Sequence, residues 1–470
     1  MTSKIACDLC IIGAGSAGLS IAAGAAQLGR KVVLVEKGEM GGDCLNYGCV
    51  PSKALIAAAA HASAIRKANA FGVSAGEPQT DFARVMAHVH AVIAAIAPHD
   101  SQERFEGLGV NVIRAPGAFI GPRELMAGDT LVRAKRFVIA TGSSPDIPPI
   151  KGLDCVSYMT NETVFGLQKR PDHLIIIGAG PVGAELAQAF RRLGAAVSLI
   201  DAARLLNRED PEAVDAIRSS LLADGVALYE ESQIDGVRQQ GDSIDVLVGD
   251  RTISGSHLLI ATGRRANVEG LDLEKASVRY STRGVDVNDR LQTSNPRIFA
   301  AGDVAGGMQF THVAGDHAST IVRNILFKMP AKRRDKLAPR AIYTEPELAS
   351  AGLSETEARA FDAKARIVRA PFSENDRARA ERDTEGFVKV ATDRKGRILG
   401  ATIVGKDAGD LIQFYALAIA EKMKIASFTN YIAPYPTRGE AAKRAASAWY
   451  TPTLFSDRTR ALVRFLSLFD

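Results

Sequence analysis

Near its start the chain passes from a continuous apolar segment through a glycine-rich turn into an alanine-rich segment. Residues 4–12 are apolar and β-prone and predict a buried strand, and residues 17–28 predict a helix. A second strand is predicted over residues 31–35 and ends on Glu36. Strand, turn, helix and strand in this order are typical of a parallel βαβ unit.

The turn between the first strand and the helix has the spacing G-x-G-x-x-G, formed by Gly13, Gly15 and Gly18. Glycines at this spacing let the backbone approach a pyrophosphate, and the start of the helix attracts its charge. The acid that ends the second strand, here Glu36, accepts hydrogen bonds from ribose hydroxyls. The first unit is therefore predicted to bind a dinucleotide.

The same pattern recurs over residues 174–201, so the chain carries two copies of one unit. From the first glycine to the acid, both copies span 23 positions. Each copy is followed by a strand that ends in Ala-Thr-Gly, over residues 137–142 and 258–263. Two such coincidences favour nucleotide binding at both turns over two turns without a ligand. The second copy consists of Gly178, Gly180, Gly183 and Asp201.

An acid at the ribose position favours an unphosphorylated ribose and repels a 2′-phosphate. Asp201 therefore predicts that the second unit prefers NADH over NADPH. Arg204 lies three residues further on and is within reach of a phosphate, which leaves NADPH as the alternative.

Composition narrows the class of protein. The 470 residues contain 58 Lys and Arg against 53 Asp and Glu, and this balance gives no electrostatic case for binding nucleic acid. No apolar run reaches the roughly 18 residues of a membrane span. The first strand follows the N-terminus at once and leaves no room for a signal peptide, so a cytoplasmic location is expected. Five cysteines, an odd number, argue against a secreted disulfide scaffold and leave redox or metal chemistry.

Two of these cysteines, Cys44 and Cys49, lie just after the first unit and before an alanine-rich helix. In an ideal helix, Cα atoms five residues apart are separated by about 8.7 Å, beyond the roughly 7 Å limit for a disulfide. A bridge between them therefore requires an irregular first turn, which Gly48 makes easy. Lys53, four residues after Cys49 on the same helical face, is placed to stabilise a thiolate or a reduced flavin.

The segment over residues 41–53 resembles the active site of the FAD-dependent pyridine-nucleotide disulfide oxidoreductases, which include dihydrolipoamide dehydrogenase, glutathione reductase and mercuric reductase. Residues 298–303 resemble the second FAD motif of that family, and residues 343–352, 386–405 and 410–422 resemble its dimerisation domain. The resemblance implies an α/β fold with two Rossmann-like domains, for FAD and NAD(P), and a C-terminal α+β domain that forms a homodimer. The predicted parts are an FAD domain over 1–150, an NAD(P) domain over 151–272, a return to the FAD region over 273–335, a dimerisation domain over 336–450 and a C-terminal amphipathic helix over 451–470.

The resemblance also assigns roles. Cys49 faces the flavin, Cys44 exchanges with substrate, and Lys53 and Glu185 form an ion pair near the flavin at the entry for the nicotinamide. The FAD contacts expected in this way are Gly13, Gly15, Ser16, Gly18, Glu36, Lys37, Gly42, Asp43, Lys53, Gly117, Thr141, Gly142, Asp303, Gln309, Thr311 and His312. The NAD contacts are Gly178, Gly180, Val182, Gly183, Glu185, Asp201 and Gly263.

At one position the sequence departs from the disulfide reductases of this family, which end with His-Pro-Thr and a glutamate; the histidine is their acid/base. The matching run here begins Tyr435-Pro436-Thr437 and retains Glu440, and no histidine follows His317. A tyrosine with a pKa of about 10 is a poor base near neutrality, whereas histidine, at about 6.5, is well matched. Tyrosine at this place resembles mercuric reductase, although the cysteine pair that ends mercuric reductases is absent. Tyr435 and Glu440 are candidate catalytic residues supplied by the opposite subunit.

Three hypotheses for the electron acceptor remain open: a small disulfide such as lipoamide, a soft metal ion or quinone, or no dedicated acceptor in a redox-responsive binding partner.

No resident metal is expected, because Cys7 and Cys10 are predicted to pack in the core of the first strand, and Cys155 is predicted to be a buried free thiol. The last helix, 458–469, places apolar residues beside Arg460 and Arg464; packing on its own dimer is favoured over contact with a membrane surface or an accessory partner. The sequence offers no reason for Asp43, where many relatives have threonine.

Overall fold

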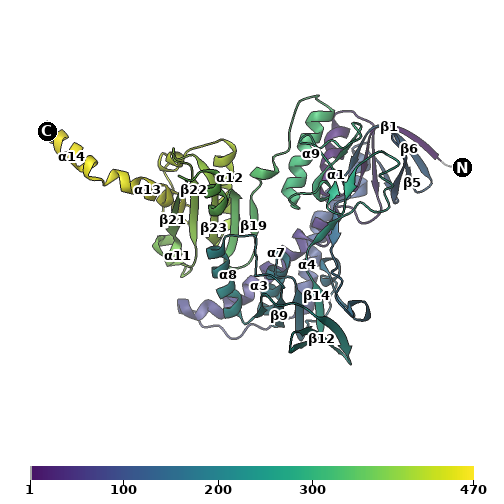
Figure 1. Cartoon of the computed structure of the whole chain (residues 1–470). Coiled ribbons are helices and arrows are strands. Elements are labelled where there is room, and N and C mark those ends of the chain that lie inside the picture. Colours follow the sequence, from purple (N-terminus) through teal and green to yellow (C-terminus); the bar gives the residue numbers. More distant parts are fainter. Residues whose placement is uncertain (1–2, 470) are drawn as a thin grey trace. The chain divides into compact units, whose positions relative to one another are not determined.

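The computed structural model describes residues 3–469 and divides into two compact units (Figure 1). The first unit contains the chain up to Ala203 and again from Val226 to Asp335. The second contains Arg204–Gly225 and the chain from Lys336 onward. The terminal residues of the predicted domains, Met1, Thr2 and Asp470, lie outside the described residues.

The first unit contains a seven-stranded sheet with the order β3-β2-β1-β6-β5-β4, and β18 pairs with β6. β1, β2, β3, β6 and β18 run parallel to their neighbours, whereas β4, β5 and β6 form an antiparallel meander. The apolar runs predicted as strands are buried on this sheet, and helices α1 and α9 pack against one another beside it. The bounds are β1 Ser3–Ile12, α1 Ser16–Gln27, β2 Val32–Glu36, β3 Asn111–Arg114, β4 Gly117–Gly121, β5 Glu124–Ala127, β6 Thr130–Ile139, β18 Ile298–Ala300 and α9 Thr311–Ile325.

A second parallel sheet in the same unit has the order β10-β9-β8-β14 and is built from the second copy of the βαβ pattern. Its β-branched strands are almost fully buried, and α7 packs on it. A three-stranded antiparallel sheet, β11-β12-β13, precedes its last strand. The bounds are β8 His173–Ile177, α7 Pro181–Arg192, β9 Ala196–Ile200, β10 Ala227–Tyr229, β11 Gly236–Gln240, β12 Ser243–Val248, β13 Arg251–Gly255 and β14 His257–Ile260.

Short elements and two longer helices complete the first unit. The helix α3 packs against α4 and α7. The bounds are α2 Gly42–Asn46, α3 Cys49–Lys67, α4 Phe82–Ile96, α5 Gln102–Gly107, β7 Ser143–Pro145, α6 Asn161–Val164, β15 Arg264–Ala266, β16 Tyr280–Ser281 and β17 Gly284–Val285.

The second unit is built on a five-stranded antiparallel sheet with the order β19-β20-β23-β22-β21. Its core contains Tyr415, Phe372 and Val390, all fully buried or nearly so. The bounds are α8 Pro211–Asp224, β19 Arg340–Ile342, β20 Glu347–Gly352, α10 Glu355–Phe361, β21 Arg366–Pro371, α11 Asp376–Ala380, β22 Phe387–Thr392, β23 Ile398–Gly405, α12 Ala408–Ala420, α13 Glu440–Leu454 and α14 Asp457–Leu466.

The predicted fold class is confirmed: two Rossmann-like parallel sheets, the first extended by an antiparallel meander, are followed by an α+β body. The finer domain boundaries stay a prediction. Cys10 is fully buried and Cys7 nearly so, as predicted for core residues of β1. The prediction for Cys155 is wrong: it is exposed, because it ends a surface turn over Leu153–Cys155 in which Leu153 takes the buried position. In the part of the chain that the structure describes, no helix combines the length and apolar character needed to cross a membrane.

Candidate active site

The first glycine turn shows why each of its glycines is needed. A Cβ on Gly13 would lie 2.2 Å from the Ala140 carbonyl oxygen, and one on Gly18 would lie 1.9 Å from the Gly13 carbonyl oxygen. Gly13 also has a φ of +107°. Gly15 is different, because a Cβ there would meet nothing within 4 Å. The outer glycines are thus fixed by packing, whereas Gly15 faces open space at the start of α1, where a phosphate can approach the backbone.

The second turn repeats this geometry. A Cβ on Gly178 would lie 2.4 Å from the Ala261 carbonyl oxygen, and one on Gly183 would lie 1.8 Å from the Gly178 carbonyl oxygen. A Cβ on Gly180 again meets nothing within 4 Å. Both turns therefore offer the same cradle for a dinucleotide, in agreement with the duplicated sequence pattern.

The two acids at the ends of the second strands are also held alike. Glu36 accepts hydrogen bonds from the N–H of Ala14 at 2.5 Å and of Gly38 at 2.6 Å. Asp201 accepts from the N–H of Ala179 at 2.6 Å and of Ala203 at 2.7 Å. Each carboxylate is thereby fixed beside its glycine turn, at the place where the fingerprint reads the ribose.

The two cysteines lie on either side of a break between α2 and α3. The helix α2 ends at Asn46 and α3 begins at Cys49, so the irregular turn that a bridge requires is present. A Cβ on Gly48 would lie 2.9 Å from Asp43 Oδ2 and 3.3 Å from the Cys44 Cα. Only glycine lets the chain pass so close. Cys44 and Cys49 are free thiols that share a hydrogen bond.

The two thiols differ in acidity. The hydrogen bond from Cys44 lowers the pKa of Cys49 to about 6, against the smaller opposing effect of burial, and Thr311 and Lys53 lower it further. Thr311 Oγ1 lies 3.5 Å from Cys49 Sγ. The same hydrogen bond, together with burial, raises the pKa of Cys44. These opposite shifts favour Cys49 over Cys44 as the thiol that loses its proton first.

Lys53 lies one helical turn after Cys49, as predicted, and forms the expected ion pair. Its Nζ lies 2.8 Å from Glu185 Oε2. Glu185 is buried in α7, five residues after the open glycine of the second turn. The pair thus connects the cysteine helix with the nucleotide unit that begins at Gly178.

Asp43 occupies a network that the sequence did not reveal. Its Oδ1 lies 3.2 Å from Nη2 of Arg264 and accepts a hydrogen bond of 3.0 Å from Asn161 Nδ2. The Asn161 amide also donates to the Tyr47 carbonyl at 3.2 Å. The neighbouring Gly42 brings this segment against the first turn, since a Cβ there would lie 2.8 Å from the Gly15 Cα.

Asp303 is connected to the same arginine. Its Oδ2 accepts a hydrogen bond of 2.6 Å from Ser143 Oγ and lies 3.9 Å from Arg264 Nε, which itself donates to Ser143 Oγ at 2.7 Å. Burial raises the pKa of Asp303, and the hydrogen bond and the arginine oppose that effect. The N–H of Gly302 donates to His317 Nδ1 at 3.1 Å, which fixes the turn that carries Asp303.

The other predicted cofactor contacts line the same strand ends and helix starts. Thr141 and Gly142 follow β6 and are tied to Asn267. The Thr141 hydroxyl donates to the Asn267 carbonyl at 2.7 Å, and the Asn267 amide donates to the Thr141 carbonyl at 2.9 Å. The backbone N–H of Asn267 donates to the Gly142 carbonyl at 3.0 Å. Gly117 is buried in β4 with Leu125 and Val35 close by, a packing reason for glycine. Their contact with a cofactor stays a prediction. The remaining positions are Ser16 at the first position of α1, Lys37 after β2, Val182 in the first turn of α7, Gly263 after β14, Gln309 before α9, and His312, stacked on Phe310 with ring centroids 5.2 Å apart.

Tyr435 and Glu440 lie in the second unit. The Tyr435 hydroxyl donates to Asp376 Oδ2 at 3.3 Å, and the negative charge of Asp376 raises the pKa of Tyr435. Glu440 Oε2 accepts the N–H of Thr437 at 3.3 Å. Between them the buried Arg438 lies 2.8 Å from Glu381 Oε2 and holds this loop in place. Tyr435 itself is 70% exposed.

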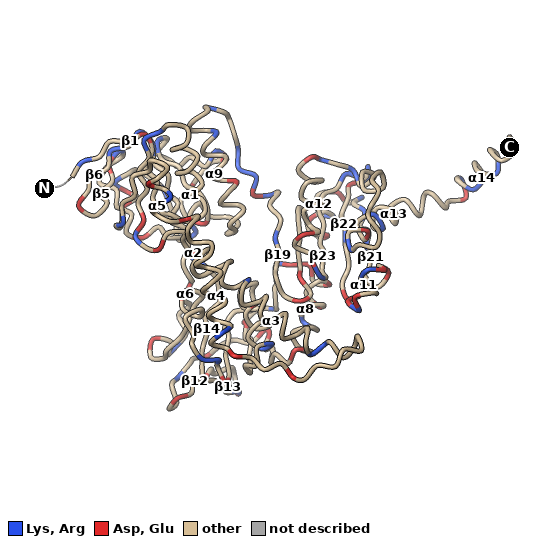
Figure 2. Tube along the Cα trace, turned by 180° about the vertical axis from the view of Figure 1, so that it is seen from behind, with Lys and Arg blue, Asp and Glu red and all other residues tan. Residues whose placement is uncertain are grey.

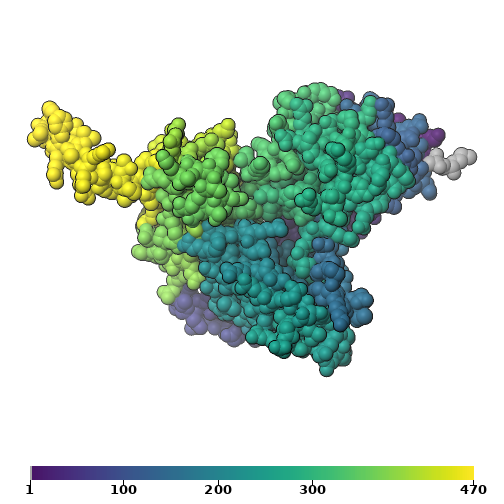
Figure 3. Space-filling view, in the orientation of Figure 1, coloured from purple at the N-terminus to yellow at the C-terminus, as the bar shows by residue number. Residues whose placement is uncertain are grey.

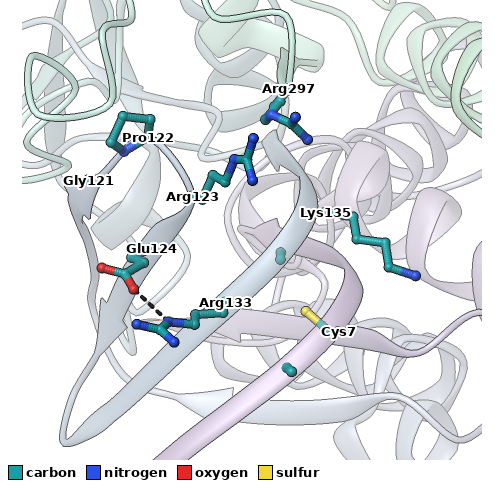
Figure 4. Close-up of a pocket in the computed structure, with 10 residues that line it drawn as sticks. Cys7, Gly121, Pro122, Arg123, Glu124, Arg133, Lys135 and Arg297 are labelled. Atoms are coloured by element: carbon teal, nitrogen blue, oxygen red, sulfur yellow. Dashed lines mark hydrogen bonds and ion pairs between the residues drawn. The ribbon is translucent and has the colours of Figure 1, made fainter.

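A groove of about 610 Å³ lies elsewhere in the first unit, beside the first halves of β1 and β6 (Figure 4). Cys7, Arg123 and Arg297 line it, together with an ion pair between Arg133 and Glu124. Among the described residues 3–469, none of those lining this groove belongs to the predicted site.

Several functional candidates escaped sequence reasoning because their partners are distant in the chain. Arg264 was missed even though it directly follows the second Ala-Thr-Gly, a position that marks it as facing the same strand ends. Ser143 directly follows the first Ala-Thr-Gly and carries the same signal, whereas Asn161 and Asp376 carry none. Within residues 3–469 no group of three or more His, Cys, Asp or Glu side chains is placed to hold a metal ion.

Two glycine cradles with ribose-reading acids, and a thiol pair beside a lysine, define a flavoprotein that exchanges electrons with a pyridine nucleotide. Family comparison agrees: residues 7–318 match pyridine nucleotide-disulphide oxidoreductase, and residues 338–446 match the dimerisation domain of the same family. The chain belongs to this family. It is an FAD-dependent, pyridine-nucleotide-dependent disulfide oxidoreductase of the mercuric reductase and dihydrolipoamide dehydrogenase type, and its dimerisation domain supports a homodimer.

Individual relatives point to both branches of the family. The chain is 38% identical to a mercuric reductase of Streptomyces lividans, over 94% of this chain and 96% of that protein. It is 32% identical to a dihydrolipoyl dehydrogenase of Bacillus subtilis, over 93% and 97%. Among solved structures, the Cu(II) complex of the HOCl-induced flavoprotein disulfide reductase RclA from Escherichia coli superposes with a TM-score of 0.85 at 27% identity, covering 94% of this chain and 99% of that one. LpdA from Mycobacterium tuberculosis gives 0.86 at 27%, covering 95% and 99%.

Proposed function

We propose that the enzyme oxidises NADH and passes the electron pair through Cys44 and Cys49 to a thiophilic metal ion. The observation that carries this proposal is Tyr435 at the place of the family's histidine base. Its hydroxyl donates to Asp376, and the charge of that aspartate raises the pKa of Tyr435 further from neutrality. A group that keeps its proton at neutral pH cannot serve as the base for thiol exchange. A phenol oxygen can still contact a metal ion held by thiolates.

Each residue of the cysteine segment has a proposed role. Bound FAD would carry the electron pair from the nicotinamide to the disulfide. Cys49, whose pKa is lowered to about 6, is the thiolate next to the flavin, and Cys44 is the thiol that meets the acceptor. Lys53 keeps positive charge beside Cys49 and is itself held by Glu185 at 2.8 Å.

The transfer to the acceptor balances in a simple way. The metal ion binds the two sulfurs as thiolates, which releases the proton of Cys44. The pair then gives up two electrons as the S–S bond forms, and the metal leaves in its reduced state. One divalent ion takes both electrons, or two ions take one each.

A homodimer suits this chemistry, because the loop with Tyr435 and Glu440 belongs to the second unit, which contains the family's dimerisation domain. We propose that each subunit supplies this loop to the cysteine pair of the other. The hydrogen bonds of Arg438 and Glu440 keep the loop ordered for that purpose.

The preference for NADH rests on Asp201. Both of its oxygens accept backbone N–H groups, so the carboxylate stays fixed beside the second glycine turn. A 2′-phosphate would bring negative charge against it. Comparison of flavin reduction by NADH and NADPH tests this point, and faster reduction by NADPH would overturn it. A cytoplasmic location stays a prediction from the sequence.

The test of the acceptor is steady-state NADH oxidation with lipoamide, oxidised glutathione, Hg(II), Cu(II) and a water-soluble quinone in parallel. We expect turnover with the metal ions that requires both Cys44 and Cys49. The matched control is Cys155→Ser, which removes an exposed cysteine outside the pair and should leave the rate unchanged. Metal turnover that survives Cys44→Ser would contradict the proposal.

A small disulfide is the second candidate acceptor, favoured by the similarity to a dihydrolipoyl dehydrogenase over 97% of its length. In that case lipoamide supports turnover, and Tyr435→His raises the rate by restoring a base near neutral pH. Turnover with the quinone alone, independent of Cys44, would instead indicate direct transfer from the flavin. No turnover with any acceptor would favour a redox-responsive binding partner.

A further inference from the structure

The C-terminal helix α14 carries an apolar surface that the rest of the second unit does not cover. Among its described residues 457–466 none is buried. In Figure 3 this end of the chain, drawn in yellow, forms an arm that projects from the second unit. Eight large apolar side chains from the end of α13 onward are each more than half exposed: Leu454, Phe455, Leu462, Val463, Phe465, Leu466, Leu468 and Phe469.

The apolar residues of α14 share one face, and two of its three arginines lie on the other. At about 100° per residue, the apolar positions from 461 to 466 cover an arc of roughly 200°. Arg460 and Arg464 lie on the remaining face. Arg458, in the first turn, lies within the apolar arc, and its long side chain can carry the guanidinium beyond the apolar side chains. Figure 2 marks these basic residues in blue along α14.

The chain leaves the packed body of the unit at a defined point. The first half of α13 is buried through its alanines, and Trp449 Nε1 donates to Thr392 Oγ1 at 2.9 Å. Arg366 Nη2 donates to the Trp449 carbonyl at 2.8 Å. Beyond this anchor the large side chains are exposed. The match to the family's dimerisation domain also ends near this point, at residue 446.

We propose that α14 is a docking surface for an anionic membrane surface. Three arginines against Asp457 and Asp470 leave the segment a net positive charge that complements acidic lipid headgroups. A second copy of the helix complements it poorly, because two such segments would bring like charges together. An apolar arc of roughly 200° is also wider than the narrow stripe by which two helices pair.

The length of the helix fits this mode of contact. Its 10 residues rise about 15 Å, half of the roughly 30 Å hydrocarbon thickness of a bilayer. The helix therefore lies in the interface with its apolar face among the acyl chains and Arg460 and Arg464 at the headgroups. The inference does not depend on the acceptor, since it concerns where the enzyme works and not what it reduces.

The test is cosedimentation of the full-length, FAD-loaded protein with vesicles of phosphatidylcholine alone and of phosphatidylcholine mixed with phosphatidylglycerol. We expect binding to the mixed vesicles that weakens at high salt. Phe465→Asp with Leu466→Asp should weaken binding about a hundredfold or more, because two apolar side chains no longer enter the membrane. Arg460→Gln with Arg464→Gln should weaken it by about thirtyfold.

The control is Phe361→Asp, which places an aspartate at a still more exposed phenylalanine, in α10, and should leave binding unchanged. Turnover in solution without vesicles should be the same for all these variants, so a failure of the proposed function is recognised separately. Absence of binding to the mixed vesicles, or equal binding to both vesicle types, overturns the proposal. So does a change from dimer to monomer in Phe465→Asp with Leu466→Asp, which would assign the helix to the subunit interface.

Discussion

At position 43 the structure supplies a reason for a carboxylate that the sequence left unexplained. Asp43 lies between the first glycine turn and Cys44, where an unpaired negative charge would repel a pyrophosphate. Its partner Arg264, at 3.2 Å, supplies the compensating charge, and the Asn161 side chain donates a hydrogen bond to the same carboxylate oxygen. The network therefore ties the cysteine segment to β15 and α6 and sets a positive charge beside the carboxylate.

Asp43→Asn should make Cys49 more acidic. The carboxylate raises the pKa of Cys49, so its removal lowers that pKa and increases the thiolate fraction at a given pH. The measurement is a pH titration of thiolate absorbance in the reduced protein, with Cys49→Ser as the baseline. Asp154→Asn, beside the exposed Cys155, is the control and should leave the curve in place. A shift toward higher pH in Asp43→Asn would contradict this account.

Lys53→Met should move the same titration the other way, because the positive charge that favours the thiolate is lost. The folded pKa of Cys49, about 6, is below its ordinary value of 9.0. The reduced protein therefore gains stability as the pH rises from about 6 to 9 and loses it as the pH falls through 6. Thermal unfolding at several pH values should show this gain in the wild type and a smaller one in Lys53→Met.

How far the sequence predicts single residues depends on separation along the chain. Gly13 and Lys53 belong to local patterns whose chemistry follows from spacing, and the role of Cys44 follows from a local segment that resembles the family's active site. Asp43 meets partners 118 and more positions away, and nothing in its own segment indicates them. Cys155 was misjudged for a related reason, since a lone cysteine gives no indication of which side of a surface turn it occupies.

In each glycine turn, the outer glycines are required by packing, whereas the middle glycine is required only by the ligand. Gly183→Ala should destabilise the fold, because its Cβ would lie 1.8 Å from a backbone oxygen. Gly180→Ala should fold normally, because its Cβ meets nothing within 4 Å and its φ of −74° suits alanine. It should still raise the KM for NADH by about tenfold or more, since a methyl group would occupy the approach of the pyrophosphate. The measurements are the melting temperature and the steady-state kinetics of both variants. A destabilised Gly180→Ala would show that Gly180 is required by packing and not only by the nucleotide.

The helix α8 is connected to β22 by a buried charge cluster. Lys389 lies 3.0 Å from Asp210, the N-cap residue of α8, and 2.8 Å from Glu212. Lys389→Met should reduce the free energy of unfolding by about 3–5 kcal/mol, because it leaves the buried carboxylate of Asp210 without its cation. Lys406→Met removes a half-exposed ion pair with Glu381 and should change it by less than about 1 kcal/mol. Denaturant unfolding compares them, and similar losses would refute the role given to burial.

The prediction of helices and strands succeeded where the hydrophobic period and the turn residues indicate the same element, as in the strands that end on Glu36 and Asp201. The assignment of α8 to the second unit could not be predicted. Its sequence continues the second βαβ repeat after β9, and only tertiary contacts place Arg204–Gly225 with the C-terminal sheet. The local sequence pattern predicts that a helix forms here. Which surface the helix packs against depends on residues far along the chain.

For the whole molecule, the proposal that subunits complete each other's sites can be tested by mixing inactive variants. Cys44→Ser removes one half of a site, and Tyr435→Ala with Glu440→Ala removes the other. If the halves come from different subunits, each mixed dimer contains one intact site, and a random mixture should recover about a quarter of wild-type activity. Recovery that stays at the level of the separate variants would place both halves within one subunit.

The pairing of β18 with β6 bears on how the chain is made. In the register, Phe137 lies opposite Ile298, and Ser143 and Asp303 join across 160 positions of the chain. A ribosome adding 5–20 residues per second needs on the order of ten seconds or more to produce that interval. Throughout it, the nascent chain presents the edge of β6 without its final neighbour, and such an edge invites pairing with other chains. Vectorial synthesis thus leaves this part of the edge of β6 open in the N-terminal half until the strand that closes its sheet has emerged.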